Sequence, residues 1–393
     1  MLPPLPPVAI TYVELRRARL PLVTPFRTSY GVEHDRDVLL VHVVGPESEG
    51  WGECVAMSEP LYTEEYVDGA EAVLARHLVP RIDTSPLDAA HLGERLSRVR
   101  GHPMAKAALE MAVLDAQLRA AGRSLASFLG AVRERVPAGV AVGIVDSVAE
   151  LLEIVSGYLA EGYLRVKLKI QPGWDIAPVR AVRERFGDVA LQVDANSAYT
   201  LADTATLAAL DPFELLLIEQ PLADHDLAGH AQLARLITTP VCLDESIGSV
   251  RDAVAAIDAG ACRIVNVKPG RVGGLFEAIR IHDVCVERDV PLWCGGMLET
   301  GVGRAANVAL AALPGFMLPG DLSASKRYFA QDLTPPFELA DGHLEVPTGP
   351  GLGVAPIAAV LDACTTSTRT IQLAATNARR RDRVRPEPLG SGP

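Results

Sequence analysis

Five charged residues end successive strand-like stretches of the chain at an almost constant spacing. They are Lys169, Asp194, Glu219, Asp244 and Lys268, separated by 25, 25, 25 and 24 residues. Each residue alone indicates little, because a polar residue after a strand is ordinarily a helix cap, a turn residue or a solvated charge. The regular set is more informative, since a period of this length corresponds to one strand plus one helix.

The three carboxylates in the middle of the series predict a metal site. Asp194, Glu219 and Asp244 would repel one another strongly in one cavity if no cation were bound. Hard oxygen ligands of this kind suit Mg²⁺, with Mn²⁺ or Co²⁺ as substitutes. The alternative is a series of helix caps that binds no ion.

The lysines predict proton transfer. Lys167 and Lys169 lie two apart in one strand, so they point to the same side of it. Lys268 ends the strand four units later and can face Lys169 across the cavity. A lysine base must be neutral, and we expect burial, the cation and a neighbouring ammonium group to lower its pKa. The alternative role for these lysines is ion pairing with the carboxylates.

Such a site suits removal of a proton next to a carboxylate, so the expected substrate is a small-molecule carboxylate. A cation stabilises the enediolate formed on deprotonation more than it stabilises the substrate. A base on each face of the enediolate gives racemisation. One lysine and a β-leaving group give elimination.

The elements that must position these residues are short apolar strands that alternate with helices. The strand-like runs include VAVGI, YLRVKLK, ALQVDA, ELLLIE, PVCLDE and CRIVNVK. This alternation predicts an α/β fold with a parallel β/α barrel, whose strand ends meet at one mouth. An open doubly wound sheet is the alternative, but no GxGxxG motif follows the first strand.

The chain divides into three expected parts. Residues 1–135 have an α+β pattern, and residues 136–365 form the barrel, whose end can pack back on the first domain. The Arg- and Pro-rich tail at residues 366–393 is expected to have no regular structure, as a solvated end or as a targeting or interaction segment. Residues 21–35 are expected to form a long functional or mobile loop between the first two strands.

Composition argues against several classes of protein. The chain has 393 residues, of which 49% are hydrophobic and 22% charged, which is typical of globular proteins. A net charge of −12 disfavours binding to nucleic acid or to an anionic membrane. No apolar run is long enough to span a membrane, and the first residues lack a signal-peptide pattern. The six cysteines show no CxxC spacing, so we expect free thiols and a cytoplasmic protein.

At these residues the sequence resembles the enolase superfamily, muconate-lactonizing subgroup. It is most similar to the N-acylamino acid racemase / o-succinylbenzoate synthase family, from about residue 10 to about residue 362. The motifs that carry the resemblance include VKLKIQPGWD, LQVDANSAYT, LLLIEQPL, CLDESI, NVKPGRVGG and WCGGMLETGVGRAANVALAALPGF. The resemblance implies a modified (β/α)7β TIM-type barrel with an N-terminal α+β capping domain that acts as a lid. It also implies a homo-oligomer, between a dimer and an octamer.

The resemblance also implies roles for single residues. The metal ligands of the family match Asp194, Glu219 and Asp244, and its two acid/base lysines match Lys169 and Lys268. The other matched positions are Lys167 in the KxK motif, Glu245 beside the ligands, and the substrate-pocket residues Phe26, Met57, Tyr62, Ala141, Asn196, Gly296, Met297, Leu298 and Tyr328.

The expected activity is divalent-metal-dependent racemisation of N-acylamino acids, N-succinyl ones in particular. The main alternative is o-succinylbenzoate synthase, which dehydrates its substrate at the same site, and both activities can coexist. Dipeptide epimerase is a weaker alternative, and a non-enzymatic binding barrel is weaker still. Three departures from the family bear on substrate preference: Ala141 stands where a close relative has a serine, Leu298 replaces an Ile and Tyr328 replaces a Phe.

Overall fold

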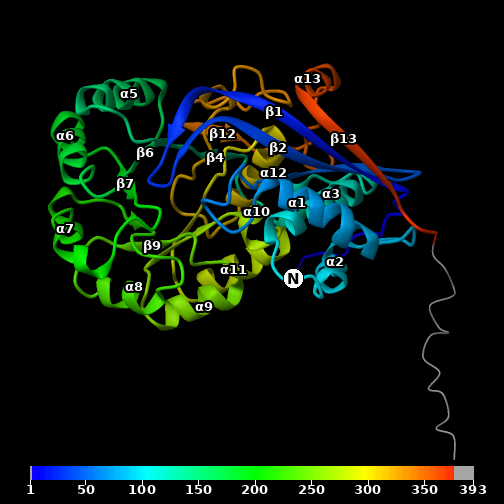
Figure 1. Cartoon of the computed structure of the whole chain (residues 1–393), viewed down its shortest axis with the longest axis horizontal. Coiled ribbons are helices and arrows are strands. Elements are labelled where there is room, and N and C mark those ends of the chain that lie inside the picture. The colour runs from blue at the N-terminus through cyan, green and yellow to red at the C-terminus, as the bar shows by residue number, and fades with distance from the viewer. Residues whose placement is uncertain (1, 376–393) are drawn as a thin grey trace, which may run out of the picture.

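The computed structural model describes residues 2–375, and its central feature is a parallel sheet of seven strands in the order β11-β10-β9-β8-β7-β6-β5. The strands are β5 (Gly139–Val142), β6 (Arg165–Lys169), β7 (Leu191–Asp194), β8 (Ile218–Glu219), β9 (Val241–Leu243), β10 (Ile264–Val267) and β11 (Leu292–Cys294). The helices of this domain are α5 (Val148–Glu161), α6 (Ile176–Phe186), α7 (Thr204–Ala208), α8 (Leu227–Leu233), α9 (Val250–Asp258), α10 (Pro269–Val272), α11 (Leu275–Glu287) and α12 (Gly301–Ala311). Figure 1 shows α5 to α9 as an outer arc around the sheet.

An irregular segment closes this sheet. On one side, the Asp321 amide donates to the carbonyl of Cys294 at 3.0 Å. On the other side, the Gly139 amide donates to the carbonyl of Gly320 at 2.7 Å. Residues 316–321 therefore lie between β11 and β5, in the place of an eighth strand. The prediction of a modified β/α barrel is confirmed, and the open doubly wound alternative is wrong.

Local sequence signals account for the boundaries of the barrel helices. Helix α5 begins after Ser147, whose side chain accepts a hydrogen bond from the Glu150 amide. It ends at Gly162, which has a φ of 97° that favours glycine. Helix α9 begins in the same way, with Ser249 accepting from the Asp252 amide. These caps set where each helix begins and ends, and hence where the neighbouring strand and its terminal charged residue lie.

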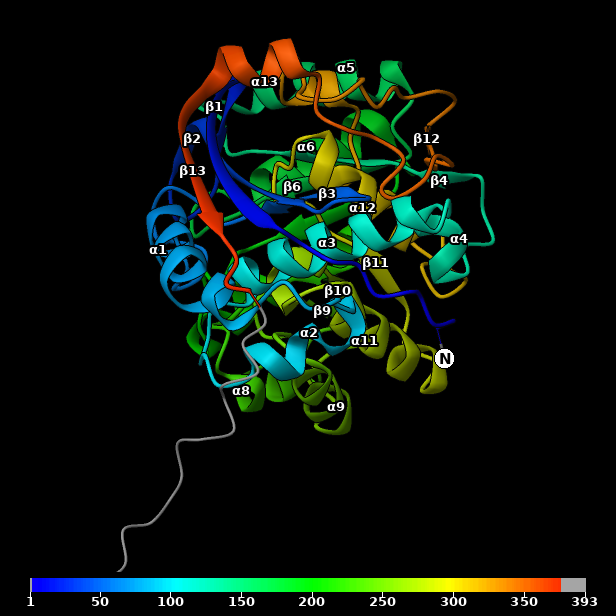
Figure 2. The same cartoon turned by 90° about the vertical axis from the view of Figure 1, so that its right-hand side faces the viewer.

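The capping domain is built on a four-stranded antiparallel sheet in the order β13-β1-β2-β3. Its strands are β1 (Tyr12–Arg27), β2 (Val32–Val44), β3 (Glu49–Cys54) and β13 (Thr365–Gln372). Its helices are α1 (Val67–Val73), which continues as a π-helix over Leu74–Leu78, α2 (Ala89–Leu96), α3 (Pro103–Ala120) and α4 (Leu125–Leu129). The remaining elements are β4 (Arg135–Pro137), which pairs with β12 (His343–Glu345), and α13 (Ala358–Cys364). In Figure 2 the last strand, β13, lies beside β1 of the same sheet.

Two expectations from the sequence are wrong in this domain. The segment 21–35 is mostly strand, because β1 extends to Arg27 and β2 begins at Val32, which leaves a short turn between them. The segment after residue 365 does not lack structure throughout, since β13 pairs with β1 through Gln372. The C-terminal part of β1 pairs with β2, and β13 pairs with β1; the local sequence does not reveal either neighbour. The rest of the predicted tail, from residue 376, lies outside the described residues.

Two buried carboxylates fasten the capping domain to the barrel. Glu53, on β3, accepts hydrogen bonds from the Thr300 and Gly303 amides at 3.0 and 2.9 Å, at the start of α12. Glu110, on α3, accepts from the Phe276 amide at 3.2 Å, in the first turn of α11. The oxygens of a carboxyl group at a helix N-terminus satisfy free backbone amides. These contacts tie the body of the capping domain to the barrel.

The cysteines and the helix lengths agree with the sequence analysis. All six cysteines are free, and five of them are buried. Among residues 2–375, no helix combines the length and the apolar character that a membrane span needs.

Candidate active site

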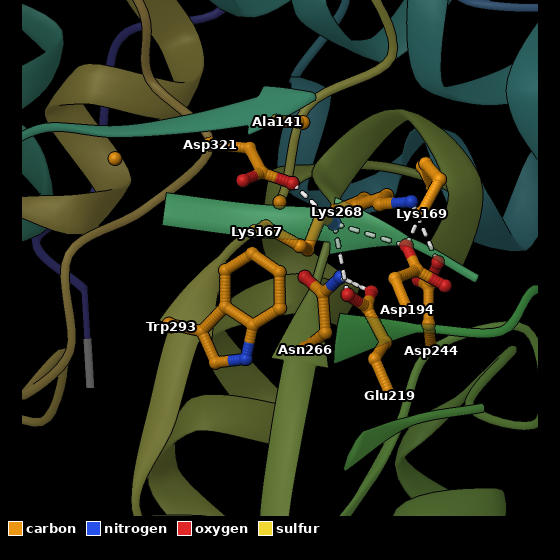
Figure 3. Close-up of polar contacts among 12 residues, drawn as sticks. Ala141, Lys167, Lys169, Asp194, Glu219, Asp244, Asn266, Lys268, Trp293 and Asp321 are labelled. Carbon is orange, nitrogen blue, oxygen red and sulfur yellow. Dashed lines mark hydrogen bonds and ion pairs between the residues drawn. The ribbon is translucent and has the colours of Figure 1, made fainter. Parts of the chain in front are cut away.

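Alternation along the barrel strands brings the predicted charged residues into one interior. On β6, Lys167 and Lys169 point inward together, and both are buried. Lys169 pairs in register with Asp194 of β7, which in turn pairs with Glu219 of β8. Asp244 follows β9 directly. Figure 3 shows these side chains converging from neighbouring strands.

Lys169 is held by polar atoms of the barrel. Its Nζ donates to Asp194 Oδ2 at 2.6 Å and to Asn196 Oδ1 at 2.7 Å. Asn196 also donates to Glu245 Oε1 at 2.9 Å, so that carboxyl group lies behind the lysine. Burial and the nearby carboxylates Asp244 and Asp194 raise the pKa of Glu245 to about 8. A protonated Glu245 would place no further negative charge beside Lys169.

Lys268 is held by Asp244 and by a tyrosine from the capping domain. Its Nζ donates to Asp244 Oδ2 at 2.6 Å and to the Tyr62 hydroxyl at 3.1 Å. The Sδ atom of Met297 lies 3.7 Å from the same nitrogen. Arg271 Nε lies 3.1 Å from Asp244 Oδ1, an ion pair without hydrogen-bond geometry.

Lys167 lies deeper and bridges several carboxylates. Its Nζ lies 2.5 Å from Asp321 Oδ2, 2.8 Å from Glu219 Oε2 and 3.1 Å from Asp194 Oδ2. Asp321 also pairs with Arg165 at 2.7 Å, and neither of these two side chains is more than 5% exposed. This buried network fixes Lys167 as a permanent positive charge below the pocket.

The ion pairs reverse the expected direction of the lysine pKa values. Burial lowers the pKa of Lys167, but Asp321 and other carboxylates raise it well above the usual value. Burial likewise lowers the pKa of Lys268, and Asp244 raises it well above the usual value. The prediction of a lowered lysine pKa is therefore wrong for Lys268 in this arrangement, because pairing with carboxylates outweighs desolvation.

A pocket lies above these charges, between the barrel mouth and the capping domain. The three lysines line it. The other predicted residues that line it are Phe26, Met57, Tyr62, Ala141, Asn196, Gly296, Met297, Leu298 and Tyr328. Asp194, Glu219, Asp244 and Glu245 do not line it but contact its lysines or Asn196. The roles of all these residues stay predictions.

The structure adds residues that the sequence analysis missed. Asp321 lines the pocket and pairs with Lys167 and Arg165, and Asn266 donates to Glu219 Oε1 at 2.7 Å. Arg165 lies two residues before Lys167, and Asn266 lies two residues before Lys268, so the period-two pattern could have found them. Asp321 lies on an irregular segment, so no strand periodicity in the sequence indicates it.

The carboxylates suit a divalent cation because they are hard oxygen ligands and because they lie close together. Asp194, Glu219 and Asp244 end three adjacent strands, and burial together with the charge of Asp194 raises the pKa of Glu219 to about 7. Asp244 Oδ1 is buried without a hydrogen bond. In residues 2–375, however, no cluster of acidic, histidine or cysteine side chains is arranged around one point as metal ligands, since lysines occupy the carboxylate oxygens. A cation would compete with those lysines.

A capping domain over a closed parallel barrel, with lysines and carboxylates at the barrel mouth, defines a class of two-domain barrel enzymes. Residues 10–130 match the family described as mandelate racemase / muconate lactonizing enzyme, N-terminal domain. Residues 150–360 match the family described as enolase C-terminal domain-like. The chain therefore belongs to the mandelate racemase / muconate lactonizing enzyme family of the enolase superfamily.

Named relatives cover nearly the whole chain. An Amycolatopsis protein named N-succinylamino acid racemase is 62% identical over 357 residues, which are 90% of this chain and 97% of that protein. A Geobacillus kaustophilus protein named o-succinylbenzoate synthase is 50% identical over 88% of this chain and 93% of its own length. The crystal structure of an enolase superfamily member from Listeria innocua superposes with a TM-score of 0.89 at 43% identity, covering 93% of this chain and 99% of that one.

Proposed function

We propose that this chain racemises N-acylamino acids, N-succinyl ones in particular, by passing the α-proton between two lysines. The observation that carries the proposal is that Lys169 and Lys268 line one pocket from strands four apart in the barrel. The name of the Amycolatopsis relative supports the choice of the N-succinyl group.

The two lysines take opposite roles in one turnover. The neutral lysine accepts the α-proton: the C–H bond breaks, an N–H bond forms, and the electron pair moves into the carboxylate to give an enediolate. The other lysine, as an ammonium group, returns a proton to the opposite face. The roles reverse for the other enantiomer, so each lysine serves one face of the substrate.

Asp194, Glu219 and Asp244 would hold one divalent cation, Mg²⁺ first, with Mn²⁺ or Co²⁺ as substitutes. When bound, the cation would neutralise the charge that develops on the substrate carboxylate. It would also replace the lysines as the positive charge that balances the three carboxylates. Lys167, fixed by Asp321, adds a second positive charge beneath the substrate.

The upper pocket suits the acyl group and the amino-acid side chain. Phe26 and Met57 come from the capping domain, and Leu298 and Tyr328 come from the barrel, all within the same lining. Leu298 has a φ of 57°, a costly conformation for leucine that fixes where its side chain enters the pocket. Because these positions are apolar or aromatic, they would select an apolar side chain.

The second candidate activity is o-succinylbenzoate synthase. The same pocket serves it, because one lysine can remove a proton and then protonate a leaving hydroxyl on the same face. The 50% identity to a relative of that name favours it.

Proton NMR in D₂O separates the two activities. The enzyme, with Mg²⁺ or Mn²⁺, is incubated with N-succinyl-L-phenylalanine and, separately, with the substrate of o-succinylbenzoate synthase. Rapid loss of the α-proton signal with growing D-enantiomer supports the racemase. Fast dehydration with negligible exchange of the amino acid would assign the protein to the synthase instead.

We further propose a cytoplasmic homo-oligomer. The six free cysteines support a reducing compartment. The oligomeric state, between dimer and octamer, stays a prediction that light scattering of the full chain would measure.

A further inference from the structure

The two lysines of the pocket differ in where their polar partners come from. Lys169 Nζ is hydrogen-bonded to Asp194 and Asn196, both at the end of β7 in the barrel. Lys268 Nζ is hydrogen-bonded to Asp244 of the barrel and to Tyr62 of the capping domain. Lys169 thus takes both of its hydrogen-bond partners from the barrel, whereas Lys268 takes one of its two from the capping domain.

The Tyr62 side chain makes two contacts with Lys268 and one with Asp244. Its hydroxyl oxygen accepts from Lys268 Nζ at 3.1 Å, and its hydroxyl proton is donated to Asp244 Oδ2 at 3.0 Å. The centre of its ring lies 4.8 Å from the same Nζ. The phenol therefore fixes the nitrogen relative to the carboxylate that already holds it.

The capping domain supplies nothing equivalent to Lys169. The ring of Phe26 lies 6.0 Å from Lys169 Nζ, but a phenyl ring provides no hydrogen-bonding oxygen. Ser29 reaches the carbonyls of Ala195 and Asn196 at 3.3 and 3.4 Å, which are backbone atoms rather than the lysine. The asymmetry between the two lysines lies in the polar contacts of their nitrogens.

Tyr62 sits on a loop that is closed at its base and exposed at its tip. The Val67 amide donates to the carbonyl of Met57 at 2.8 Å, and Glu65 accepts from the Met104 amide at 2.7 Å. At the tip, Leu61 is 49% exposed. A loop of this kind can open locally while the body of the domain stays anchored.

We propose that Tyr62 is a positioning residue for Lys268, so that the capping loop completes one of the two proton-transfer faces. A lysine nitrogen ends a chain of four rotatable bonds, and a second hydrogen bond restricts the positions it can take. Without the hydroxyl, Lys268 keeps Asp244 alone as an oxygen partner, whereas Lys169 keeps two. This inference rests on the proposed racemase function, since it assigns one lysine to each face.

The test is Tyr62→Phe, which keeps the ring and removes only the hydroxyl. Because the two enantiomers have equal free energies, the racemisation rates in the two directions must change together. Deuterium exchange with retention of configuration is therefore the measurement that separates the faces. It is followed by NMR in D₂O for each pure enantiomer, and Lys268→Ala shows which enantiomer depends on Lys268.

Tyr62→Phe is expected to slow retention exchange of the Lys268-dependent enantiomer about three- to tenfold, the usual worth of one hydrogen bond. Exchange of the other enantiomer should change by less than about twofold. The matched control is Tyr66→Phe. Tyr66 lies at the base of the same loop with an exposed side chain, so removal of its hydroxyl should change neither rate.

Equal slowing of both enantiomers, or of neither, would overturn the role of Tyr62. Failure of the proposed function is distinguishable, because the wild-type enzyme would then exchange neither enantiomer. If Tyr62→Phe lowered the yield of folded protein, the ratio of the two exchange rates would still decide, since that ratio is independent of the enzyme concentration.

Discussion

Gly295 stands beside Lys268, and the structure predicts what a methyl group there would do. A Cβ atom at this position would lie 2.4 Å from Asn266 Oδ1, 2.5 Å from Lys268 Cε and 2.7 Å from Asn266 Nδ2. Both neighbours are buried and hydrogen-bonded, Asn266 to Glu219 and Lys268 to Asp244 and Tyr62. Gly295→Ala therefore displaces both Lys268 and Asn266.

The size of the effect follows from the displacement. Ordinary van der Waals contact begins at 3.4 Å, so the lysine must retreat by about 1 Å. A misplacement of about 1 Å costs roughly a hundredfold in rate when the group must reach a reacting atom. We therefore expect the Lys268-dependent retention exchange to fall about a hundredfold and racemisation to fall with it. Exchange through Lys169, on β6, should fall less, because the displacement reaches it indirectly, through Asn266 and its partner Glu219.

The assay is deuterium exchange of each enantiomer by NMR, with melting curves to confirm folding. Gly157→Ala is the matched control, because a Cβ there meets open space within α5. It should leave both exchange rates unchanged. Wild-type exchange of both enantiomers by Gly295→Ala would refute the placement of Lys268 at the reacting atom.

Other buried charges give three further predictions. Asp321→Asn leaves Lys167 and Arg165 without their shared carboxylate, so urea denaturation should show that the free energy of unfolding falls by about 3–5 kcal/mol. The control is Glu161→Gln, which breaks an exposed ion pair and should lower that free energy by less than about 1 kcal/mol. Burial raises the pKa of Glu110 to about 8. The folded state therefore holds its proton more tightly, and stability should fall as the pH rises from about 4.5 to about 8, less steeply in Glu110→Gln by parallel urea titrations. Treatment with EDTA should abolish α-proton exchange, and Mn²⁺ should restore it; undiminished exchange in EDTA would contradict the metal proposal.

The spacing of strand ends made the barrel and much of its mouth predictable. Lys169, Asp194 and Glu219 are neighbours because β6, β7 and β8 pair in order, which the period alone indicates. Lys167 followed from the two-residue repeat of a strand. These inferences needed only the local pattern and the rule that the strand ends of a barrel meet.

Contacts between distant segments could not be predicted in the same way. Asp321 lies on an irregular segment, and its partner Arg165 is 156 residues away. The hydroxyl of Tyr62 meets Asp244 across 182 residues, so a residue predicted to line the pocket also contacts a lysine. The pairing of β13 with β1 likewise depends on which edge the folded sheet leaves free. The predicted direction of the Lys268 pKa shift was wrong because it depends on which carboxylates approach the nitrogen.

The central claim is that Lys169 and Lys268 serve opposite faces of one substrate. The most direct measurement is α-proton exchange in D₂O for each enantiomer of N-succinylphenylalanine, by Lys169→Ala and Lys268→Ala side by side. Neither variant is expected to racemise the substrate, and each should still exchange the one enantiomer that the other variant has lost. Exchange of both enantiomers at wild-type rates by Lys268→Ala would contradict the central claim.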